Sequence, residues 1–461
     1  MRVGLFIFPV RFSNLPPIDI AYLSAYLKKR GHEVYLHDFN VEIPVSDDCD
    51  TDIWCDLGNQ ERLFNKNKHI VEAWVQQILD FAPDVVGFSV WHSQLYFSLQ
   101  IAQMVKARNK DIKVVFGGPW CSYMGSSLSY VIGDGVDYIV YGEGEATLSE
   151  IVESENSKRA IAGCFRRIDG EIVDGGWREE IGDLDLLPFP DYAHFDFNKY
   201  LLSAYPILLG RGCTWNCSFC TRRSVWRNFR YRSPENIFEE MRHCFSRYPF
   251  MKKFQSCDHA MNANMPQLLR LCDLIIGENI HIEEFSGFGQ VNPLMLQEEV
   301  MLKLKRAGFN SWGIGVQSGS DRILKSMKRP YTAAQAERML EVMYRAGVLV
   351  TIDFIIGYPE ETEEDFKLTS EFTARVGKYV TNISVCPHCF VGGNDLALHP
   401  ERYGIYALNK AQDTWESAAN TPAIRRRRYQ CLMKQLAVQG VAHQHANADR
   451  DKILKEEQRM G

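Results

Sequence analysis

Strand-like and helix-like segments alternate along most of this chain, and this alternation constrains its fold more than any other feature. In residues 1–150, apolar stretches with the length and composition of strands lie at 3–8, 33–36, 85–90, 114–116 and 137–141. Segments with apolar residues at helical spacing lie at 18–30, 71–81, 95–108 and 128–132. This order predicts a doubly wound α/β domain with a parallel sheet, whose ligands bind beyond the carboxyl ends of the strands.

A second alternation occupies residues 201–390. Its expected strands lie at 205–210, 252–257, 281–287, 311–316, 349–356 and 380–386. Its expected helices lie at 234–247, 265–278, 294–307, 332–346 and 363–376. Six strands alternating with helices predict a partial (β/α)6 barrel, with its active site at the carboxyl ends of the strands.

Two further segments flank the second alternation. Residues 151–200 are predicted to form a linker, because 183–191 combines prolines with acidic residues. Residues 391–461 are predicted to form a short helical C-terminal segment, in which the helix over 411–440 is interrupted near Pro422. The four consecutive arginines at 425–428 are interpreted as a solvated helix face, with phosphate binding as the alternative.

Three cysteines, Cys213, Cys217 and Cys220, follow the first expected barrel strand with the spacing C-x3-C-x2-C. Iron–sulfur clusters normally take four cysteine thiolates. Three on one loop with no fourth nearby leave one iron free to bind a small molecule, so the spacing predicts a metal cluster that takes part in chemistry. A structural zinc site needs a further pair of ligands, and disulfide frameworks are typical of small secreted proteins, so both alternatives are disfavoured.

Net charge, cysteine usage and the length of apolar runs indicate the partners and the cellular location of the protein. The net charge of −6 gives no global basic surface for nucleic acid. The 13 cysteines show no regular pattern outside the group of three, which is typical of reduced thiols in a cytosol. No apolar run reaches the length of a membrane span. With 461 residues, we expect a cytoplasmic protein of two or three domains without nucleic-acid or membrane partners.

The sequence resembles the radical S-adenosylmethionine (SAM) superfamily, and within it the branch that carries an N-terminal cobalamin (B12)-binding domain. Beside the cysteines, the resemblance rests on short strings that are individually weak but occur in the order of that branch. They are PDVVGFS at 83–89, GGP at 117–119, YGEGE at 141–145, RYRSPE at 230–235, GIGVQSGS at 313–320 and FIIGYPEET at 354–362.

The resemblance implies the cofactors and the kind of reaction. The three cysteines would bind a 4Fe–4S cluster, and SAM would chelate the open iron. One electron from a flavodoxin- or ferredoxin-type donor would then cleave SAM to a 5′-deoxyadenosyl radical, which abstracts hydrogen from an unactivated position. The protein's part in such chemistry is to place the reactants and to exclude side reactions.

The resemblance also assigns SAM contacts by position. Ser256 and Asp258 would meet the methionyl amino group, Gln317 the ribose hydroxyls, Gly357 the adenine, and Phe219 the adenine or the cluster. Each has a plainer interpretation from the residues alone, such as loop packing for Phe219 and a turn cap for Asp258. Many relatives carry glutamate where Gln317 stands, and an amide brings hydrogen bonds without charge.

For the first domain, the resemblance implies a cobalamin site. Gly117 and Gly118 would let the nucleotide tail of the cofactor lie against backbone, and Ser89 would bond to that tail. Many cobalamin proteins ligate cobalt with a histidine from a loop that corresponds to residues 9–17, and this loop has no histidine. The alternative is a domain kept for structure or for substrate binding, in which the glycines merely end a strand.

Two features near the expected barrel mouth carry further hypotheses. Cys386 and Cys389 close the sixth barrel strand, and Cys389 is a candidate catalytic residue that would supply hydrogen, ligate the cluster or contact cobalt. The alternative is a pair of ordinary half-buried cysteines. Arg222, Arg223 and Arg227 follow the cluster cysteines and would bind a carboxylate or phosphate, or else form a solvated loop.

These expectations favour a cobalamin-dependent radical SAM methyltransferase that acts on an unactivated carbon of a small metabolite, a natural-product intermediate or a peptide. The alternative is an enzyme of the same architecture that does not methylate, because fold-level resemblance does not separate the two. A tRNA methylthiotransferase is disfavoured, since the first domain lacks a second group of cluster cysteines and the C-terminal segment is expected to be helical. A non-catalytic cobalamin or redox sensor is disfavoured by the intact cysteine group.

Overall fold

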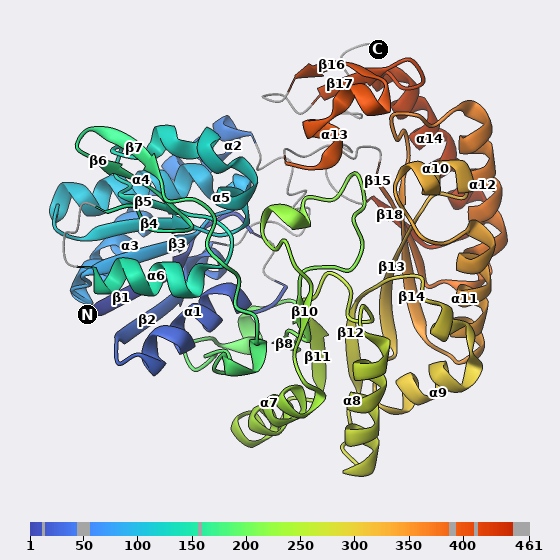
Figure 1. Cartoon of the computed structure of the whole chain (residues 1–461), viewed down its shortest axis with the longest axis horizontal. Coiled ribbons are helices and arrows are strands. Elements are labelled where there is room, and N and C mark those ends of the chain that lie inside the picture. The colour runs from blue at the N-terminus through green and yellow to red at the C-terminus, as the bar shows by residue number, and fades with distance from the viewer. Residues whose placement is uncertain (12–13, 44–55, 155–158, 387–392, 410–413, 446–461) are drawn as a thin grey trace. The chain divides into compact units, whose positions relative to one another are not determined.

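The structure is a computed structural model, and it describes all residues except 12–13, 44–55, 155–158, 387–392, 410–413 and 446–461. The chain divides into two compact units (Figure 1). Unit 1 comprises Met1–Pro206 with Ser224–Trp226, and unit 2 comprises Ile207–Arg223 with Arg227–Gly461.

Unit 1 is built on a sheet whose strand order is β2-β1-β3-β4-β5-β6-β7. The strands are β1 (Arg2–Ile7), β2 (Glu33–Asp38), β3 (Val85–Ser89), β4 (Lys113–Gly117), β5 (Tyr138–Val140), β6 (Cys164–Ile168) and β7 (Glu171–Asp174). Strands β1 to β5 pair in parallel, as the doubly wound prediction requires. The order reverses between β1 and β3, and ligands of doubly wound sheets bind at such a switch point.

The helices of unit 1 lie between these strands in the chain. They are α1 (Ile18–Lys29), α2 (Leu57–Lys66), α3 (Lys68–Asp80), α4 (Leu95–Arg108), α5 (Pro119–Met124) and α6 (Gly144–Glu153), with 3-10 turns η1 (Phe39–Glu42), η3 (His92–Gln94), η4 (Gly125–Val131), η5 (Leu184–Leu186) and η6 (Phe197–Lys199). The helix expected at 128–132 is the 3-10 turn η4. Helices α3 and α4 pack on a core rich in aromatic side chains, in which the rings of Phe8 and Phe39 stack at 5.5 Å.

The linker expected at 151–200 is wrong for its first half. Strands β6 and β7 form an antiparallel hairpin that extends the sheet of unit 1 beyond β5. Its turn is Asp169-Gly170, and both residues have positive φ, at 48° and 93°. Asp-Gly between two strands is a strong hairpin signal because two-residue hairpin turns need positive φ, so this hairpin was predictable.

Unit 2 contains a second sheet, with the strand order β18-β15-β14-β13-β12-β11-β8 (Figure 1). The strands are β8 (Tyr205–Ile207), β11 (Lys253–Ser256), β12 (Glu284–Gly289), β13 (Ser311–Gln317), β14 (Leu349–Ile355), β15 (Asn382–Cys386) and β18 (His443–His445). All pairs from β11 to β15, and the pair of β15 with β18, are parallel. The partial barrel is thus confirmed, with β18 as an additional edge strand.

Helices cover the outer side of this sheet (Figure 1). They are α7 (Pro234–Arg247), α8 (Met265–Gly277), α9 (Glu298–Arg306), α10 (Asp321–Ser326), α11 (Ala333–Arg345) and α12 (Glu363–Val376). The 3-10 turns in this part of the chain are η7 (Arg222–Ser224), which follows the three cysteines, η8 (Pro293–Leu296) and η9 (Gly377–Tyr379). Their ends carry standard signals: Thr332 and Thr362 each form a capping box at the start of α11 and α12. Two short strands, β9 (Gly210–Arg211) and β10 (Arg230–Tyr231), pair with each other beside the barrel.

The C-terminal segment is only partly helical, which corrects the prediction. It contains α13 (Asp395–Leu398), the turn η10 (Pro400–Tyr403), a hairpin of β16 (Ile405–Asn409) with β17 (Thr414–Ser417), and α14 (Pro422–Val438). Strand β17 lies where the helix over 411–440 was expected to begin. Pro422 occupies the first position of α14, where its missing N–H costs nothing, and so starts the helix instead of interrupting it.

The arginine run at 425–428 is not a solvated face throughout. Arg425 and Arg428 are buried, because α14 turns this side toward the loop after β14. Arg428 Nη1 donates to the carbonyl and to Oε2 of buried Glu361, at 2.9 and 3.3 Å. The guanidinium of Arg425 lies 3.9 Å from the ring centroid of Trp415. In the part of the chain that the structure describes, no helix is long and apolar enough to cross a membrane.

Candidate active site

The three cysteines lie on the loop after β9, next to side chains that donate hydrogen bonds to their sulfurs. Gln290 Nε2 lies 3.0 Å from Cys213 Sγ. Arg329 Nη1 lies 3.1 Å from Cys217 Sγ. The backbone N–H of Trp215 also points to Cys213 Sγ, at 3.4 Å. Donors aimed at sulfur stabilise negative charge on it, which suits thiolates that ligate a metal cluster.

The backbone of this loop is fixed by residues that are distant in the sequence. The N–H of Ser218 donates to the carbonyl of Met327 at 3.3 Å, and its carbonyl accepts from the N–H of Leu396 at 3.2 Å. The hydroxyls of Ser218 and Tyr358 are hydrogen bonded at 2.9 Å. Asn394 Nδ2 donates to the carbonyl of Phe219 at 2.9 Å. The loop geometry is therefore set by the barrel and the C-terminal segment together.

Electrostatics at the cysteines reflect burial opposed by arginine. Burial raises the pKa of the Cys213 and Cys220 thiols, while Arg329 acts to lower both values and Arg222 that of Cys220. Metal binding replaces the thiol proton, so the neighbouring positive charge favours the ligating form. Among the described residues no three His, Cys, Asp or Glu side chains converge on one metal ion.

The structure places Phe219 against an apolar group formed by the C-terminal segment and the loop after β14. Phe219 is half-buried and packs against a cluster of buried side chains, among them Tyr358, Leu396 and Trp415. This contact anchors the cysteine loop, and a contact of Phe219 with the adenine or the cluster stays a prediction.

Ser256 and Asp258 form a closed hydrogen-bonded group at the end of β11. Asp258 accepts from the N–H groups of Leu209 at 2.8 Å and Gly210 at 2.5 Å, and from the Ser256 hydroxyl at 2.7 Å. Burial raises the pKa of Asp258 to about 6. Ser256 lies on the same, buried face of β11 as Phe254. Asp258 therefore holds the backbone at Leu209 and Gly210, which leads into the cysteine loop.

Gln317 is the last residue of β13 and Gly357 lies in the loop directly after β14, and both have unusual backbone conformations. Gln317 has φ of 72° at a bulge in the pairing of β13 with β14. Positive φ in a residue other than glycine is uncommon and is concentrated at functional sites. Gly357 has φ of 84°, and a Cβ there would lie 2.3 Å from Arg425 Cγ. Both positions lie at the carboxyl ends of barrel strands, where the active site was expected.

Sequence reasoning missed several side chains of this region. Besides Gln290, they are Arg329 and Tyr331, whose hydroxyl donates to the carbonyl of Val316 at 2.7 Å, and Asp353 in the middle of β14. Burial raises the pKa of Asp353 to about 6. Arg329 meets Cys217 across 112 positions of sequence, and no local pattern reports such a contact. For Gln317 the strained φ is likewise invisible in the sequence.

In unit 1, candidate residues gather at the switch point of the sheet. Ser89 ends β3, and its hydroxyl donates to Asp19 Oδ2 of α1 at 2.6 Å. Three buried polar atoms here, Asp19 Oδ1 and the indole Nε1 of Trp91 and Trp120, have no hydrogen-bond partner within the described ranges. Unpaired buried groups are rare in native proteins. They fit a ligand that brings both donors and acceptors, as the amide-bearing cobalamin does.

The two glycines of this edge differ. At Gly118, with φ of 93°, a Cβ would meet the backbone N of Val90 at 2.7 Å, so the glycine is required by the chain's own packing. At Gly117 the nearest atom to a Cβ is that of Val140 at 3.9 Å. Only Gly117 therefore leaves room for a ligand to approach the backbone.

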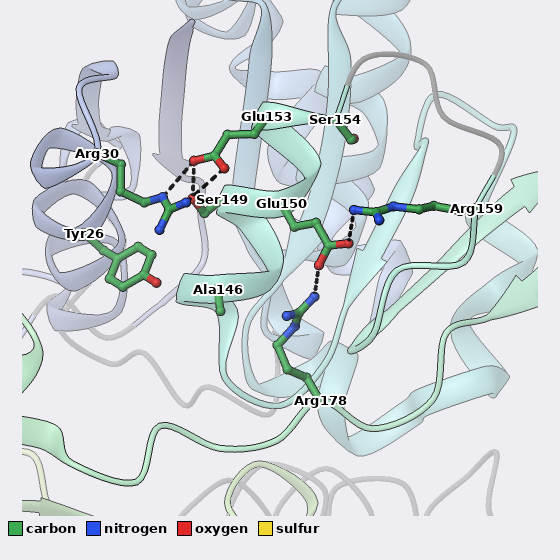
Figure 2. A pocket seen from close by; sticks show the side chains of 9 residues that line it. All are labelled: Tyr26, Arg30, Ala146, Ser149, Glu150, Glu153, Ser154, Arg159 and Arg178. Carbon is green, nitrogen blue, oxygen red and sulfur yellow. Dashed lines mark hydrogen bonds and ion pairs between the residues drawn. The ribbon is translucent and has the colours of Figure 1, made fainter.

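A pocket of about 350 Å³ lies elsewhere in unit 1, lined by the end of α1, by α6 along its length, and by Arg159 and Arg178 (Figure 2). Figure 2 shows its charges paired with one another: Arg30 bonds to Glu153 at 2.7 Å, and Arg159 and Arg178 bond to Glu150. Its lining includes none of the residues proposed for the switch point. The pocket is an ion-pair network and not a candidate for the active site.

Two remaining predictions concern the barrel mouth. Cys386 is half-buried at the end of β15, and Cys389 lies outside the described residues. Arg222, Arg223 and Arg227 are exposed. Of the three, Arg222 lies near enough to Cys220 to influence its pKa.

Two family models match the chain, in the order that the fold suggests. The model of the B12 binding domain matches residues 6–152, and the model of the radical SAM superfamily matches residues 207–373. The first match covers the doubly wound sheet of unit 1 up to α6. The second covers the cysteine loop and the barrel up to α12.

Similar proteins agree with these matches. An uncharacterized methyltransferase, PH0819, of Pyrococcus horikoshii is 25% identical over 78% of this chain and 73% of its own length. The anaerobic magnesium-protoporphyrin IX monomethyl ester cyclase of Rubrivivax gelatinosus is 25% identical over 77% of this chain, which spans only 61% of that relative.

The fold is also that of a solved structure. The radical S-adenosylmethionine methyltransferase TsrM of Kitasatospora setae, solved with cobalamin and a [4Fe-4S] cluster, superposes with a TM-score of 0.71. The superposition covers 95% of this chain and 88% of TsrM at 14% sequence identity. The chain therefore belongs to the branch of the radical SAM superfamily that carries an N-terminal B12-binding domain.

Proposed function

We propose that this chain is a cobalamin-dependent radical SAM methyltransferase that acts on an unactivated carbon of a small metabolite, a natural-product intermediate or a peptide. One observation carries the proposal: three cysteines on one loop at the carboxyl rim of the barrel, with two of their sulfurs contacted by Gln290 and Arg329. The match of unit 1 to a B12-binding domain supports cobalamin as the second cofactor.

In this proposal, Cys213, Cys217 and Cys220 hold the cluster and leave one iron for SAM. When bound, the cluster and SAM supply a radical that removes hydrogen from the substrate, and cobalamin supplies the methyl group. Gln290 and Arg329 keep the cysteine sulfurs hydrogen bonded and exclude water from this side of the loop. The electron enters from a flavodoxin- or ferredoxin-type protein.

The SAM contacts are proposed for the rim of the barrel. Gln317 is suited to hydrogen-bond ribose hydroxyls, since its strained backbone places an amide at the end of β13. Gly357 shapes the loop after β14, where the adenine is proposed to lie, while the space that its Cβ would fill is taken by Arg425. We assign Ser256, Asp258 and Phe219 a supporting role, because their bonds and contacts go to the protein itself.

Cobalamin is proposed to bind at the switch point of unit 1. Trp91 and Trp120 would donate to acceptors of the cofactor, and Asp19 would accept from its amides. Ser89 holds Asp19 in place and keeps a lone pair for the nucleotide tail. Gly117 offers the open backbone, while Gly118 sustains the turn that presents it.

The alternative function is a radical SAM reaction without methylation. It is supported by the cyclase among the relatives, whose name describes no methyl transfer. The stoichiometry of products tests between the two. Methylation requires S-adenosylhomocysteine in proportion to 5′-deoxyadenosine, since a second SAM restores the methyl group. Formation of 5′-deoxyadenosine without proportionate S-adenosylhomocysteine, in the presence of a turned-over substrate, contradicts the methyltransferase.

A further inference from the structure

Phe288 is an aromatic side chain that a barrel strand leaves open to the interior. Along β12 the buried positions are Phe285, Gly287 and Gly289, which alternate with less buried ones. Phe285 stacks on Phe254 and Phe309 in the core. Phe288 has the opposite parity and therefore points away from that core, to the concave side of the sheet. Its exposed fraction is 53%, whereas that of Phe285 is 0%.

The position of Phe288 relates it to the cysteine loop. Gln290, whose amide contacts Cys213, lies two residues further along the chain. Side chains two residues apart in an extended segment share a face and are about 7 Å apart. Phe288 therefore lies on the same face as Gln290, one step further from the carboxyl end of the strand.

The neighbouring strand makes room for this ring. Gly313 of β13 pairs in register with Phe288, and a Cβ at Gly313 would lie 2.8 Å from Phe288 Cδ1. Any side chain at residue 313 would displace the ring. Across the described part of the chain, no second aromatic ring packs against Phe288. An aromatic side chain of this size normally buries its faces, so the open ring is unusual for a folded strand.

Polar side chains border the same space. Thr351 is in register with Gly313, and Asn382 with Thr351. Asp353 and Ser384 form the next pair toward the rim, and they share a hydrogen bond. The interior thus combines one open ring with hydroxyl, amide and carboxyl groups. This arrangement is typical of pockets that bind a flat apolar group and orient its polar substituents.

We propose that the barrel interior binds the substrate through a planar aromatic or conjugated group that stacks on Phe288. The proposal rests on the proposed function, because it places the substrate beside the radical site, and it adds the substrate class. Aromatic rings prefer offset-stacked or edge-to-face contact with one another, and such pairs gain affinity beyond that of area alone. A substrate with an aliphatic group of the same size would lose this part of its affinity.

The test uses the anaerobically reconstituted full chain and two probes, indole and cyclohexanol, whose binding is measured by ligand-observed NMR. We expect indole to bind the wild type and cyclohexanol to bind markedly more weakly. Phe288→Leu, which keeps an apolar side chain, should weaken indole binding on the order of tenfold. Phe288→Tyr should retain it. Phe250→Ala is the matched control, since this phenylalanine is 69% exposed but lies outside the barrel strands.

The proposal is overturned if indole does not bind, if cyclohexanol binds equally well, or if Phe288→Leu binds indole like the wild type. The comparison of the two probes needs no variant, so a variant that fails to fold leaves the test intact. Formation of 5′-deoxyadenosine from SAM by the wild type is measured in parallel. Its absence contradicts the proposed function, whereas SAM cleavage without preference for indole contradicts only the assignment of Phe288.

Discussion

Arg329 donates a hydrogen bond of 3.1 Å to Cys217 Sγ, and the same guanidinium lies 4.5 Å from the ring centroid of Trp215. A second bond joins Arg329 to the carbonyl of Gly315 in β13. The Arg329 side chain thus connects the cysteine loop to strand β13. A fixed positive charge against a cluster ligand stabilises the more negative, reduced state of the cluster.

Replacing Arg329 should therefore lower the reduction potential of the cluster. We expect Arg329→Ala to lower it by on the order of 60 mV, the change that corresponds to a tenfold equilibrium effect for one electron. Arg329→Lys keeps the positive charge but loses the planar set of N–H donors, so its reduction potential should lie between those of the wild type and Arg329→Ala. A redox titration followed by EPR measures the shift, with the exposed Arg345→Ala as control. An unchanged potential in Arg329→Ala would contradict this role.

Loss of the three cysteines should abolish the cluster. The variant Cys213→Ala/Cys217→Ala/Cys220→Ala is expected to retain no iron after anaerobic reconstitution, and to form no 5′-deoxyadenosine, because the thiolates proposed to ligate the cluster are removed. Iron and sulfide analysis and product chromatography measure both. Cys431→Ala, at an exposed position of α14, should keep cluster and activity. If the triple variant still cleaved SAM, the assignment of the cluster would be wrong.

Asp258 should contribute to stability more than to SAM affinity. Asp258→Ala leaves the buried N–H groups of Leu209 and Gly210 without their acceptor. Two orphaned donors cost about 2–4 kcal/mol in the free energy of unfolding. Urea unfolding of the apo protein checks this value, with the exposed Asp273→Ala as control. A variant of unchanged stability that binds SAM more weakly would restore the contact with the methionyl amino group.

Asp38 should make unit 1 less stable as the pH rises. Burial raises its pKa to about 6 in the folded protein, and its carboxylate accepts from the Tyr200 hydroxyl at 3.1 Å. In the unfolded chain Asp38 loses its proton near pH 4, whereas in the folded protein it keeps the proton until about pH 6. Between these two pH values the folded state binds more protons than the unfolded state, so the free energy of unfolding falls as the pH rises. Relative to Asp38→Asn, the wild type should lose on the order of 2–3 kcal/mol between pH 4 and pH 7. Parallel pH profiles of the two proteins would disprove the raised pKa.

Two neighbouring arginines of α14, Arg427 and Arg428, should contribute very differently to stability. Arg428→Ala removes the cation beside buried Glu361, and leaving a buried carboxylate unpaired costs about 3–5 kcal/mol. Arg427→Ala breaks only an exposed pair with Glu363 and should cost less than about 1 kcal/mol. Thermal or urea unfolding of both variants measures the difference. Equal stability of the two would contradict the assigned burial.

Most of the barrel could be predicted from the sequence, because apolar periodicity and helix caps are local signals. Strand β13 was expected at 311–316 and spans Ser311–Gln317, and α12 was expected at 363–376 and spans Glu363–Val376. The hairpin of β6 and β7 was missed although its Asp-Gly turn marks it. The prolines and acidic residues of the linker begin only after this hairpin, at 183–191.

Other parts of the site depend on contacts that no local pattern reports. Arg428 looks solvated in a run of charges, and its burial is explained by its bonds to Glu361, Glu363 and Asn420. Gln290 and Arg329 reach the cysteines from the ends of different barrel elements. From the sequence, Asp258 could contact a ligand or cap a turn. Its hydrogen bonds to backbone N–H groups, such as that of Leu209, depend on the fold and cannot be seen in the sequence.

The most direct test of the account is the cofactor content of the purified protein. We would reconstitute the chain anaerobically with iron, sulfide and hydroxocobalamin, desalt it, and quantify iron and cobalt by absorbance and metal analysis. The account predicts cobalt in equal amount to the protein, together with a four-iron cluster. A cluster without cobalt would contradict the cobalamin-dependent methyltransferase and give first place to a reaction without methylation.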